Sequence, residues 1–193
     1  EMIMDLYTLE LPRQHRRRRV WKRFMEKYNC QTICEIGVQE GRNFMLMIEH
    51  NPKLAVAIDP WIDDGVISRN SSGYSQEDLD QQYENLKALA KVRTFIKVIR
   101  DYSFNTVHDF PKNYFDLVYI DADHTYDAVL KDINDWYPKV KKGRVLAGDD
   151  YINLRKIKTG IRFGVKQAVN EFAQTNGLVV HKLPGYNWAL IKK

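Results

Sequence analysis

Short apolar segments alternate with helical patterns along most of this chain. Five segments are rich in β-branched and aromatic residues and apolar over their centres: 32–37, 54–60, 94–100, 115–121 and 144–150. Helical patterns lie between and after them: 41–50, 76–91, 103–109, 125–137 and 161–175. Strands that are apolar throughout are typical of a parallel sheet covered by helices on both faces. The alternation therefore predicts an α/β fold built on a doubly wound, mostly parallel sheet.

The C-terminal segment has a different pattern. The β-rich stretches "GLVVHKL" (177–183) and "NWALIKK" (187–193) are separated by three residues, and Pro184-Gly185 is a strong turn signal. Two strands joined by so short a turn must be antiparallel neighbours. We therefore expect a seven-stranded sheet that is parallel except for a C-terminal antiparallel hairpin.

The composition fits one globular domain with a core of its own. The chain has 193 residues, of which 44% are hydrophobic and 28% are charged. No apolar run approaches the roughly 20 residues of a membrane-spanning helix, and the first residues lack the pattern of a secretory signal. Cys30 and Cys34 have no partners for a zinc site and are interpreted as free thiols of a reducing compartment. These features predict a cytoplasmic protein without a membrane segment.

The net charge of +5 is concentrated near the N-terminus. The run "RQHRRRRVWKR" (13–23) holds seven Lys or Arg residues and no acid, a composition that can bind phosphates or anionic lipid. Four large apolar residues nevertheless recur there at helical spacing: Trp21, Phe24, Met25 and Tyr28. They indicate an amphipathic helix with one face in a core and its arginines in solvent. We therefore divide the chain into a basic helical cap, residues 1–29, and a main domain, residues 30–193.

Acidic residues lie at the end of every predicted strand. One is inside the first strand and the others end or follow their strands: Glu35, Asp59, Asp101, Asp121, Asp149 and Asp150. Because the carboxyl ends of parallel strands meet at one edge, these acids should lie together where open α/β sheets bind ligands. A single aspartate in such a position would commonly cap a helix or hold a turn. The same feature on five strands indicates a binding site.

A glycine turn follows the first predicted strand. In "EIGVQEG" the residues Gly37 and Gly41 are spaced G-x-x-x-G. This is not the G-x-G-x-x-G of dinucleotide-binding folds, which counts against a nicotinamide-dependent dehydrogenase. Glu35 and Glu40 would repel a pyrophosphate, so the turn suits a ligand that carries positive charge. Asp59 is placed to accept both hydroxyls of a ribose.

In combination, "CEIGVQEG", "AIDPW" and the C-terminal hairpin resemble the class I S-adenosylmethionine-dependent methyltransferases. The resemblance covers residues 30–193 and implies their Rossmann-like α/β sandwich, with S-adenosylmethionine as the cofactor. It also implies that Glu35, Gly37 and Gly41 border the methionine part of that cofactor. The other cofactor residues that it implies lie at the ribose, at the adenine and after the fourth strand: Asp59 and Trp61, Asp101 and Tyr102, and Asp121.

The segment "IDADHTYDAVLKDINDWYPKVKKGRVLAGDDY" resembles a narrower group, the metal-dependent small-molecule O-methyltransferases of the macrocin and aminocoumarin-sugar type. It is more distantly similar to the catechol type, which has Asp-Asn in place of Asp149-Asp150. The resemblance implies that Asp121, Asp149 and Asp150 bind Mg²⁺ and that Asp123 is the base. A hydroxyl bound to a hard cation becomes more acidic. His124 is the second candidate base, because an imidazole titrates near neutral pH.

Simpler roles for these residues stay open. Asp123 and Thr125 are both good caps for the helix that follows, and Asp149-Asp150 would hydrogen-bond a turn. Many enzymes of this class use no metal. The polar segment 63–78 is predicted to be a lid that closes over the cofactor and helps to shape the acceptor pocket.

We therefore expect an O-methyltransferase that acts, with help from Mg²⁺, on a small hydroxylated acceptor, sugar-like or similar. One alternative is a metal-independent methyltransferase of the same fold that acts on RNA through the basic helix. Another is a non-catalytic module that binds the cofactor or a partner. Nucleic acid is not the favoured partner, because no nucleic-acid-binding motif accompanies the charge. The sequence pattern leaves the oligomeric state unknown.

Overall fold

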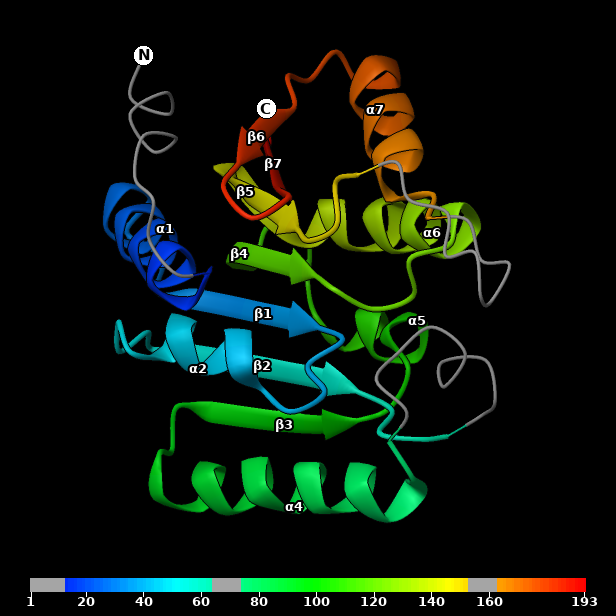
Figure 1. Cartoon of the computed structure of the whole chain (residues 1–193). Helices are drawn as coiled ribbons and strands as arrows, with labels where there is room; N and C mark the ends of the chain where they lie inside the picture. Colours follow the sequence, from blue (N-terminus) through cyan, green and yellow to red (C-terminus); the bar gives the residue numbers. More distant parts are fainter. Residues whose placement is uncertain (1–12, 64–73, 153–162) are drawn as a thin grey trace.

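Seven strands form one sheet in the computed structural model, which describes residues 13–63, 74–152 and 163–193 (Figure 1). The strands run in the spatial order β3-β2-β1-β4-β5-β7-β6. Their bounds are Thr32–Ile36 (β1), Leu54–Asp59 (β2), Ile96–Arg100 (β3), Phe115–Ile120 (β4), Val140–Gly148 (β5), His181–Leu183 (β6) and Asn187–Ile191 (β7). Neighbours among β1 to β5 are parallel, whereas β7 is antiparallel to both β5 and β6. The predicted parallel sheet with a C-terminal antiparallel hairpin is confirmed.

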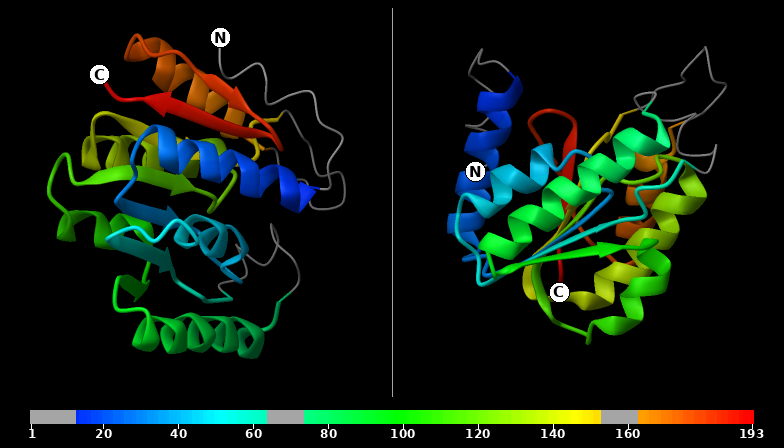
Figure 2. Two further views of the ribbon diagram at one scale, coloured as in Figure 1. Left: turned by 90° about the vertical axis from the view of Figure 1, so that its left-hand side faces the viewer. Right: turned by 90° about the horizontal axis from the view of Figure 1, so that it is seen from below.

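Helices cover both faces of this sheet (Figure 2). One face is covered by α1, α2 and α4, and the other by α6, α7 and the turn that follows α5. Their bounds are Arg13–Lys27 (α1), Arg42–Ile48 (α2), Gln76–Val92 (α4), Ser103–Thr106 (α5), Tyr126–Trp136 (α6) and Val165–Thr175 (α7). Within the described ranges, no helix is long and apolar enough to cross a membrane. The two helical layers complete the Rossmann-like sandwich that the alternating pattern predicts.

The N-terminal helix α1 packs into the same core as the first strand. Trp21, Phe24 and Met25 on α1 are buried in one cluster with Ile33 of β1. The predicted apolar face of this helix is therefore confirmed. The side chains of residues 13–19, where most of the arginine run lies, are outside the described part of the structure.

The alternation of side chains along a strand decides which helical layer each residue faces. In β1, Ile33 belongs to the cluster under α1 and α2, and Cys34 belongs to the cluster under α6 and α7. The next residue, Glu35, therefore points toward α1 and α2. Its register partner in β4 is Tyr119, which lies in the same cluster as Ile33. An acid is thus placed beside apolar core residues, close to the carboxyl edge of the sheet.

The fifth strand begins earlier than its sequence pattern indicates. We predict residues 144–150, whereas β5 starts at Val140, which pairs with Phe115 before the register shifts. Gly143 lies in this irregular part of the strand and has a φ of 71°, a conformation that favours glycine. The polar residues around Gly143 hide the strand pattern there, because they interrupt the apolar run.

The first arm of the C-terminal hairpin is shorter than predicted. Only His181–Leu183 of the predicted stretch 177–183 joins the sheet. The start of that stretch closes helix α7 instead, since the Gly177 N–H donates to the Gln174 carbonyl at 3.2 Å and the Leu178 N–H to the Ala173 carbonyl at 2.8 Å.

The ends of β1 and β4 meet at Gly37. This residue has a φ of 80°, and a Cβ on it would lie 2.2 Å from the carbonyl oxygen of Asp121. The hydrogen-bond ladder continues past the strand ends, since the Asp121 N–H donates to the Ile36 carbonyl at 2.8 Å. The Gly37 N–H donates in the same way to the Ile58 carbonyl at 2.9 Å. Glycine at this position allows the loops after β1, β2 and β4 to come together.

Gly37→Ala is expected to destabilise the protein far more than Gly143→Ala. Both glycines have a positive φ, so each substitution adds about 1–2 kcal/mol of backbone strain. A Cβ at Gly143 meets nothing within 4 Å, whereas one at Gly37 collides with backbone atoms. Urea unfolding should therefore show a loss of about 1–2 kcal/mol for Gly143→Ala and more than about 3 kcal/mol for Gly37→Ala. Equal losses would contradict the close contact with Asp121.

Candidate active site

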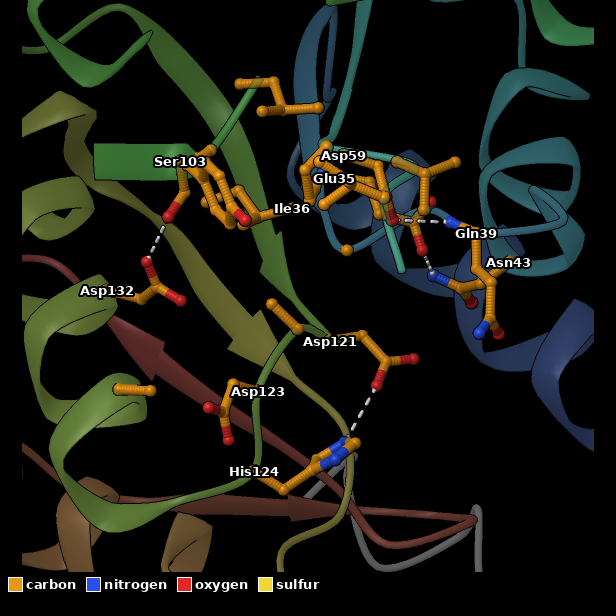
Figure 3. Close-up of a pocket in the computed structure, with 18 of the residues that line it drawn as sticks. Glu35, Ile36, Gln39, Asn43, Asp59, Ser103, Asp121, Asp123, His124 and Asp132 are labelled. Atoms are coloured by element: carbon orange, nitrogen blue, oxygen red, sulfur yellow. Dashed lines mark hydrogen bonds and ion pairs between the residues drawn. The ribbon is translucent and has the colours of Figure 1, made fainter. Parts of the chain in front are cut away.

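A cavity of about 620 Å³ lies at the carboxyl ends of β1, β2 and β4 (Figure 3). Its wall includes these predicted site residues: Glu35, Gly37, Asp59, Tyr102, Asp121, Asp123 and His124. It also includes polar residues that we did not predict: Gln39, Asn43, Ser103, Lys131 and Asp132. The cavity therefore lies at the edge of the sheet where the sequence predicts a binding site.

Asp59 joins the loops after β1 and β2. Its Oδ2 accepts the Gln39 N–H at 2.9 Å, and its Oδ1 accepts the Trp61 N–H at 2.7 Å. Burial raises the pKa of Asp59, and the backbone hydrogen bonds offset part of this effect. Trp61 is fully buried behind the loop, where its indole N–H donates to the Gln39 carbonyl at 3.0 Å. Trp61 does not line the cavity, so it supports the predicted ribose-binding aspartate from behind.

Of the two residues predicted to lie at the adenine, one lines the cavity and the other lies behind its wall. Tyr102 lines the cavity, and its ring stacks on Phe104 with the ring centroids 5.2 Å apart. Asp101 lies behind the wall, where its Oδ1 accepts the Tyr102 N–H at 2.7 Å and a hydrogen bond from Asn105 Nδ2 at 2.8 Å. Gly41 is also behind the wall and precedes α2 with a φ of 78°. Asp101 and Gly41 therefore shape the loops that form the cavity.

His124 lies between two of the predicted metal ligands. Its Nε2 is 3.3 Å from Asp121 Oδ1 (Figure 3) and 3.2 Å from Asp150 Oδ2. Burial lowers the pKa of His124, but the hydrogen bond with Asp121 and the charges of Asp121, Asp150 and Asp149 outweigh burial, so the pKa is raised. The ring also stacks on Phe163, with the ring centroids 4.9 Å apart. The surroundings therefore favour the charged form of this imidazole.

The three acids predicted to bind Mg²⁺ have suitable chemistry but not a suitable arrangement. Asp121, Asp149 and Asp150 follow β4 and β5, and hard cations prefer carboxylate oxygens. Asp149 Oδ1, however, accepts the Asp150 N–H at 2.9 Å, and the His124 ring stands between Asp121 and Asp150. Across the residues that the structure describes, no three His, Cys, Asp or Glu side chains are grouped to hold a metal ion. In this structure two of the three acids, Asp121 and Asp150, contact the His124 imidazole.

Asp123 combines a turn hydrogen bond with a place on the cavity wall. Its Oδ1 accepts the Thr125 N–H at 2.8 Å, directly before α6 begins. Asp123 therefore holds the turn before the helix, whereas the helix itself has Thr125 as its N-cap and no capping hydrogen bond from a side chain. The carboxylate also lines the cavity, next to His124 (Figure 3). The two candidate bases are therefore neighbours on one wall.

The predicted lid, residues 63–78, is described only at its ends, because residues 64–73 lie outside the described structure. The Asp63 N–H donates to Gln76 Oε1 at 2.9 Å, which links the two ends. Tyr74 lines the cavity. The two described ends of the segment are therefore linked to each other beside the cavity, and closure of the segment over a cofactor stays a prediction.

Asp132 is a buried carboxyl in the part of the wall that α6 forms. Its Oδ1 accepts the Ser103 hydroxyl at 2.6 Å (Figure 3). Burial raises the pKa of Asp132 to about 6. A sequence signal was present, because Asp132 shares the buried face of α6 with Val129, Ile133 and Trp136. An acid on the apolar face of a predicted helix is a reason to look for a cavity beside it.

The strand order, the glycine turn after β1 and the adjacent cavity define an α/β protein of the class I methyltransferase type. A family described as a methyltransferase domain matches residues 34–151 of the chain. The chain belongs to this methyltransferase family.

Two solved structures illustrate the shared fold. A Staphylococcus aureus protein, provisionally named a caffeoyl-CoA O-methyltransferase, has a TM-score of 0.67 and 14% identity, covering 100% of this chain and 89% of that one. An O-methyltransferase from Bacillus cereus in complex with SAH has a TM-score of 0.62 and 14% identity, covering 98% of this chain and 86% of that one. At such low identity the likeness concerns the fold alone.

A curated relative is closer in sequence but longer. An uncharacterized protein of Acanthamoeba polyphaga mimivirus is 31% identical over 133 residues, which is 64% of this chain and 53% of the relative. The chain therefore spans about half the length of that relative.

Asp132→Asn is expected to stabilise the protein at high pH and to lose this advantage at low pH. The folded-state pKa of about 6 lies above the usual 3.8, so the stability associated with Asp132 is fully present below pH 3.8 and is lost as the pH rises through about 6. Asparagine has no charge to bury. Urea unfolding at pH 8 should show a gain of about 2–3 kcal/mol over wild type, declining toward zero near pH 4.

Asp127→Asn is the matched control for this experiment, because it makes the same chemical change at an exposed position of α6. A difference between Asp132→Asn and wild type that stays constant with pH would contradict a buried carboxylate.

Proposed function

We propose that the protein transfers a methyl group from S-adenosylmethionine to a hydroxyl of a small acceptor, sugar-like or similar. The observation that carries this proposal is the cavity of about 620 Å³, a size typical of small-molecule sites. Its wall combines the glycine turn and Asp59 with the two candidate bases, Asp123 and His124. The Bacillus cereus structure with the same fold is an O-methyltransferase that carries SAH, which supports the choice of cofactor and reaction.

The cofactor is proposed to lie along the loops that follow β1, β2 and β3. Glu35 and Gly37 would border its methionine part, which carries positive charge, and Tyr102 would lie at the adenine. The Gln39 and Trp61 N–H groups donate to the two oxygens of Asp59, and the Val38 N–H also interacts with this carboxylate. A carboxylate has about four acceptor positions, so Asp59 can also accept a ribose hydroxyl.

The proposed reaction is a displacement at the methyl carbon. The acceptor oxygen forms a bond to the methyl group while the carbon–sulfur bond breaks, and the sulfonium leaves as a neutral thioether. Because the sulfonium is already a good leaving group, the protein must supply orientation and a proton acceptor. We assign the proton to the Asp123 carboxylate. His124 is the second candidate and would have to be in its neutral form to accept the proton, whereas its surroundings favour the charged form.

Assistance by Mg²⁺ is a separate proposal, and it rests on the sequence resemblance. Asp121, Asp149 and Asp150 would hold the ion, which when bound would lower the pKa of a coordinated hydroxyl. Because His124 stands between Asp121 and Asp150, the imidazole would first have to move away. The geometry therefore supports His124 as the positive group at this edge ahead of a metal ion.

Asp123→Asn is expected to lower the rate of methyl transfer by about a hundredfold or more, because a positioned base contributes about 10²–10⁴ and an amide cannot accept the proton. Affinity for SAH should not change, since Asp123 lies outside the proposed cofactor contacts. The rate is measured as transfer of labelled methyl from S-adenosylmethionine to a panel of small hydroxylated compounds, and the affinity by titration calorimetry.

His124→Gln is the comparison for that variant. A slow His124→Gln protein beside a fully active Asp123→Asn protein would move the role of base to His124. Wild-type protein that does not bind SAH would refute the cofactor assignment itself.

Mg²⁺ is expected to bind His124→Ala more tightly than wild-type protein. Removing the imidazole takes away the positive group between Asp121 and Asp150, so these carboxylates attract a cation more strongly. Titration calorimetry with Mg²⁺ measures the difference, and the double variant with Asp149→Ala tests whether the predicted ligands are used. If wild type binds Mg²⁺ equally well and a chelator stops methyl transfer, the metal-assisted reaction is correct instead.

A further inference from the structure

A buried chain of hydrogen bonds connects helix α1 to the cavity. The Trp21 indole N–H donates to Asn43 Oδ1 at 2.6 Å, and Asn43 Nδ2 donates to Glu35 Oε1 at 3.1 Å, a bond that Figure 3 shows. All three residues are buried: Trp21 is 1% exposed, Asn43 6% and Glu35 1%. Asn43 and Glu35 line the cavity and Trp21 does not. One amide therefore joins a residue of α1 to an acid of the candidate cofactor site.

The chemistry of the three groups fixes the orientation of the middle one. An indole N–H can only donate, and Glu35 Oε1 is the acceptor of the hydrogen bond from Asn43 Nδ2. Asn43 satisfies both neighbours only when its carbonyl faces Trp21 and its amide NH₂ faces Glu35. With the amide turned over, NH₂ would meet the indole N–H and the carbonyl would meet the carboxylate. Trp21 thus selects the rotamer of Asn43 that donates to Glu35.

Packing holds Trp21 in position for this task. Its ring meets the ring of Tyr119 edge to face, with the centroids 5.0 Å apart and an interplanar angle of 84°. Tyr119 is also the register partner of Glu35 across the β1–β4 pair. Trp21 therefore lies over the strand pair that carries Glu35. Because that ring contact does not involve the indole N–H, losing the N–H alone should leave the packing in place.

We propose that Trp21 and Asn43 are positioning residues for Glu35, so that α1 is part of the cofactor site. The inference rests on the proposed function, in which Glu35 borders the methionine part of S-adenosylmethionine. A buried hydrogen-bond chain of this kind holds its members in one arrangement, and removal of the first donor leaves the next acceptor unsatisfied. Without the Trp21 N–H, the Asn43 amide can turn over, and Glu35 then loses its hydrogen bond from Asn43.

Trp21→Phe tests the proposal, because it removes the indole N–H and keeps an aromatic ring. Trp136→Phe is the matched control: Trp136 is 0% exposed, and its indole N–H has no hydrogen-bond partner among the described residues. Both variants lose a similar volume from the core. We expect Trp21→Phe to bind SAH about tenfold more weakly than wild type by calorimetry, and Trp136→Phe to bind it as wild type does. Equal affinity in the two variants would overturn the proposal.

A measurement on the unmodified protein removes any dependence on how a variant folds. The chain has four tryptophans, so a ¹H–¹⁵N spectrum contains four indole signals, which the Trp→Phe variants assign. Saturation with SAH should shift the Trp21 signal, although Trp21 does not line the cavity, and leave the Trp136 signal in place. A Trp21 signal that does not move in SAH-saturated protein would overturn the proposal. Wild-type protein that does not bind SAH would overturn the proposed function and this inference with it.

Discussion

The contact between Gly37 and the carbonyl of Asp121 brings the two halves of the site together. Because glycine has no Cβ, the turn after β1 lies directly against the end of β4, and residues of both strands face one cavity. Glu35 reaches the cavity from the first strand, and Asp123 and His124 reach it from the loop after the fourth. A wider separation of β1 and β4 would divide these residues between two surfaces, and neither surface would carry both the proposed cofactor contacts and the candidate bases.

Charge is the second constraint on the cavity. Carboxylates at the ends of several strands concentrate negative potential at one edge, and burial makes their ionised forms costly, as the raised pKa values of Asp59 and Asp132 show. Within the described residues, His124 is the imidazole that stands between two of these acids. A ligand with a sulfonium and an ammonium group would supply further positive charge, so the charge of the wall suits the proposed cofactor.

The features that could be predicted from the sequence are those with local signals. Strand alternation, the glycine turn and an acid after each strand depend on neighbouring residues, and they identified the fold and much of the cavity wall. The place of His124 was not predictable, because it depends on how closely the loops after β4 and β5 approach. Asn43 was missed for a related reason: its hydrogen bond with Trp21 joins two helices across 22 residues, a pairing that no periodicity encodes.

Helix α1 was interpreted from its charge and its apolar spacing as an amphipathic cap, and the structure adds that Trp21 on its buried face belongs to one hydrogen-bonded unit with Glu35. Coupling between two equilibria is reciprocal, so if a docked α1 strengthens cofactor binding, the bound cofactor strengthens the docking of α1 by the same factor. Lys22 and Arg23, on the exposed side of the helix, are one and two residues from Trp21. A polyanion that shifted α1 would therefore change the cofactor site through Asn43, whereas one that bound without moving the helix would leave Glu35 where it is.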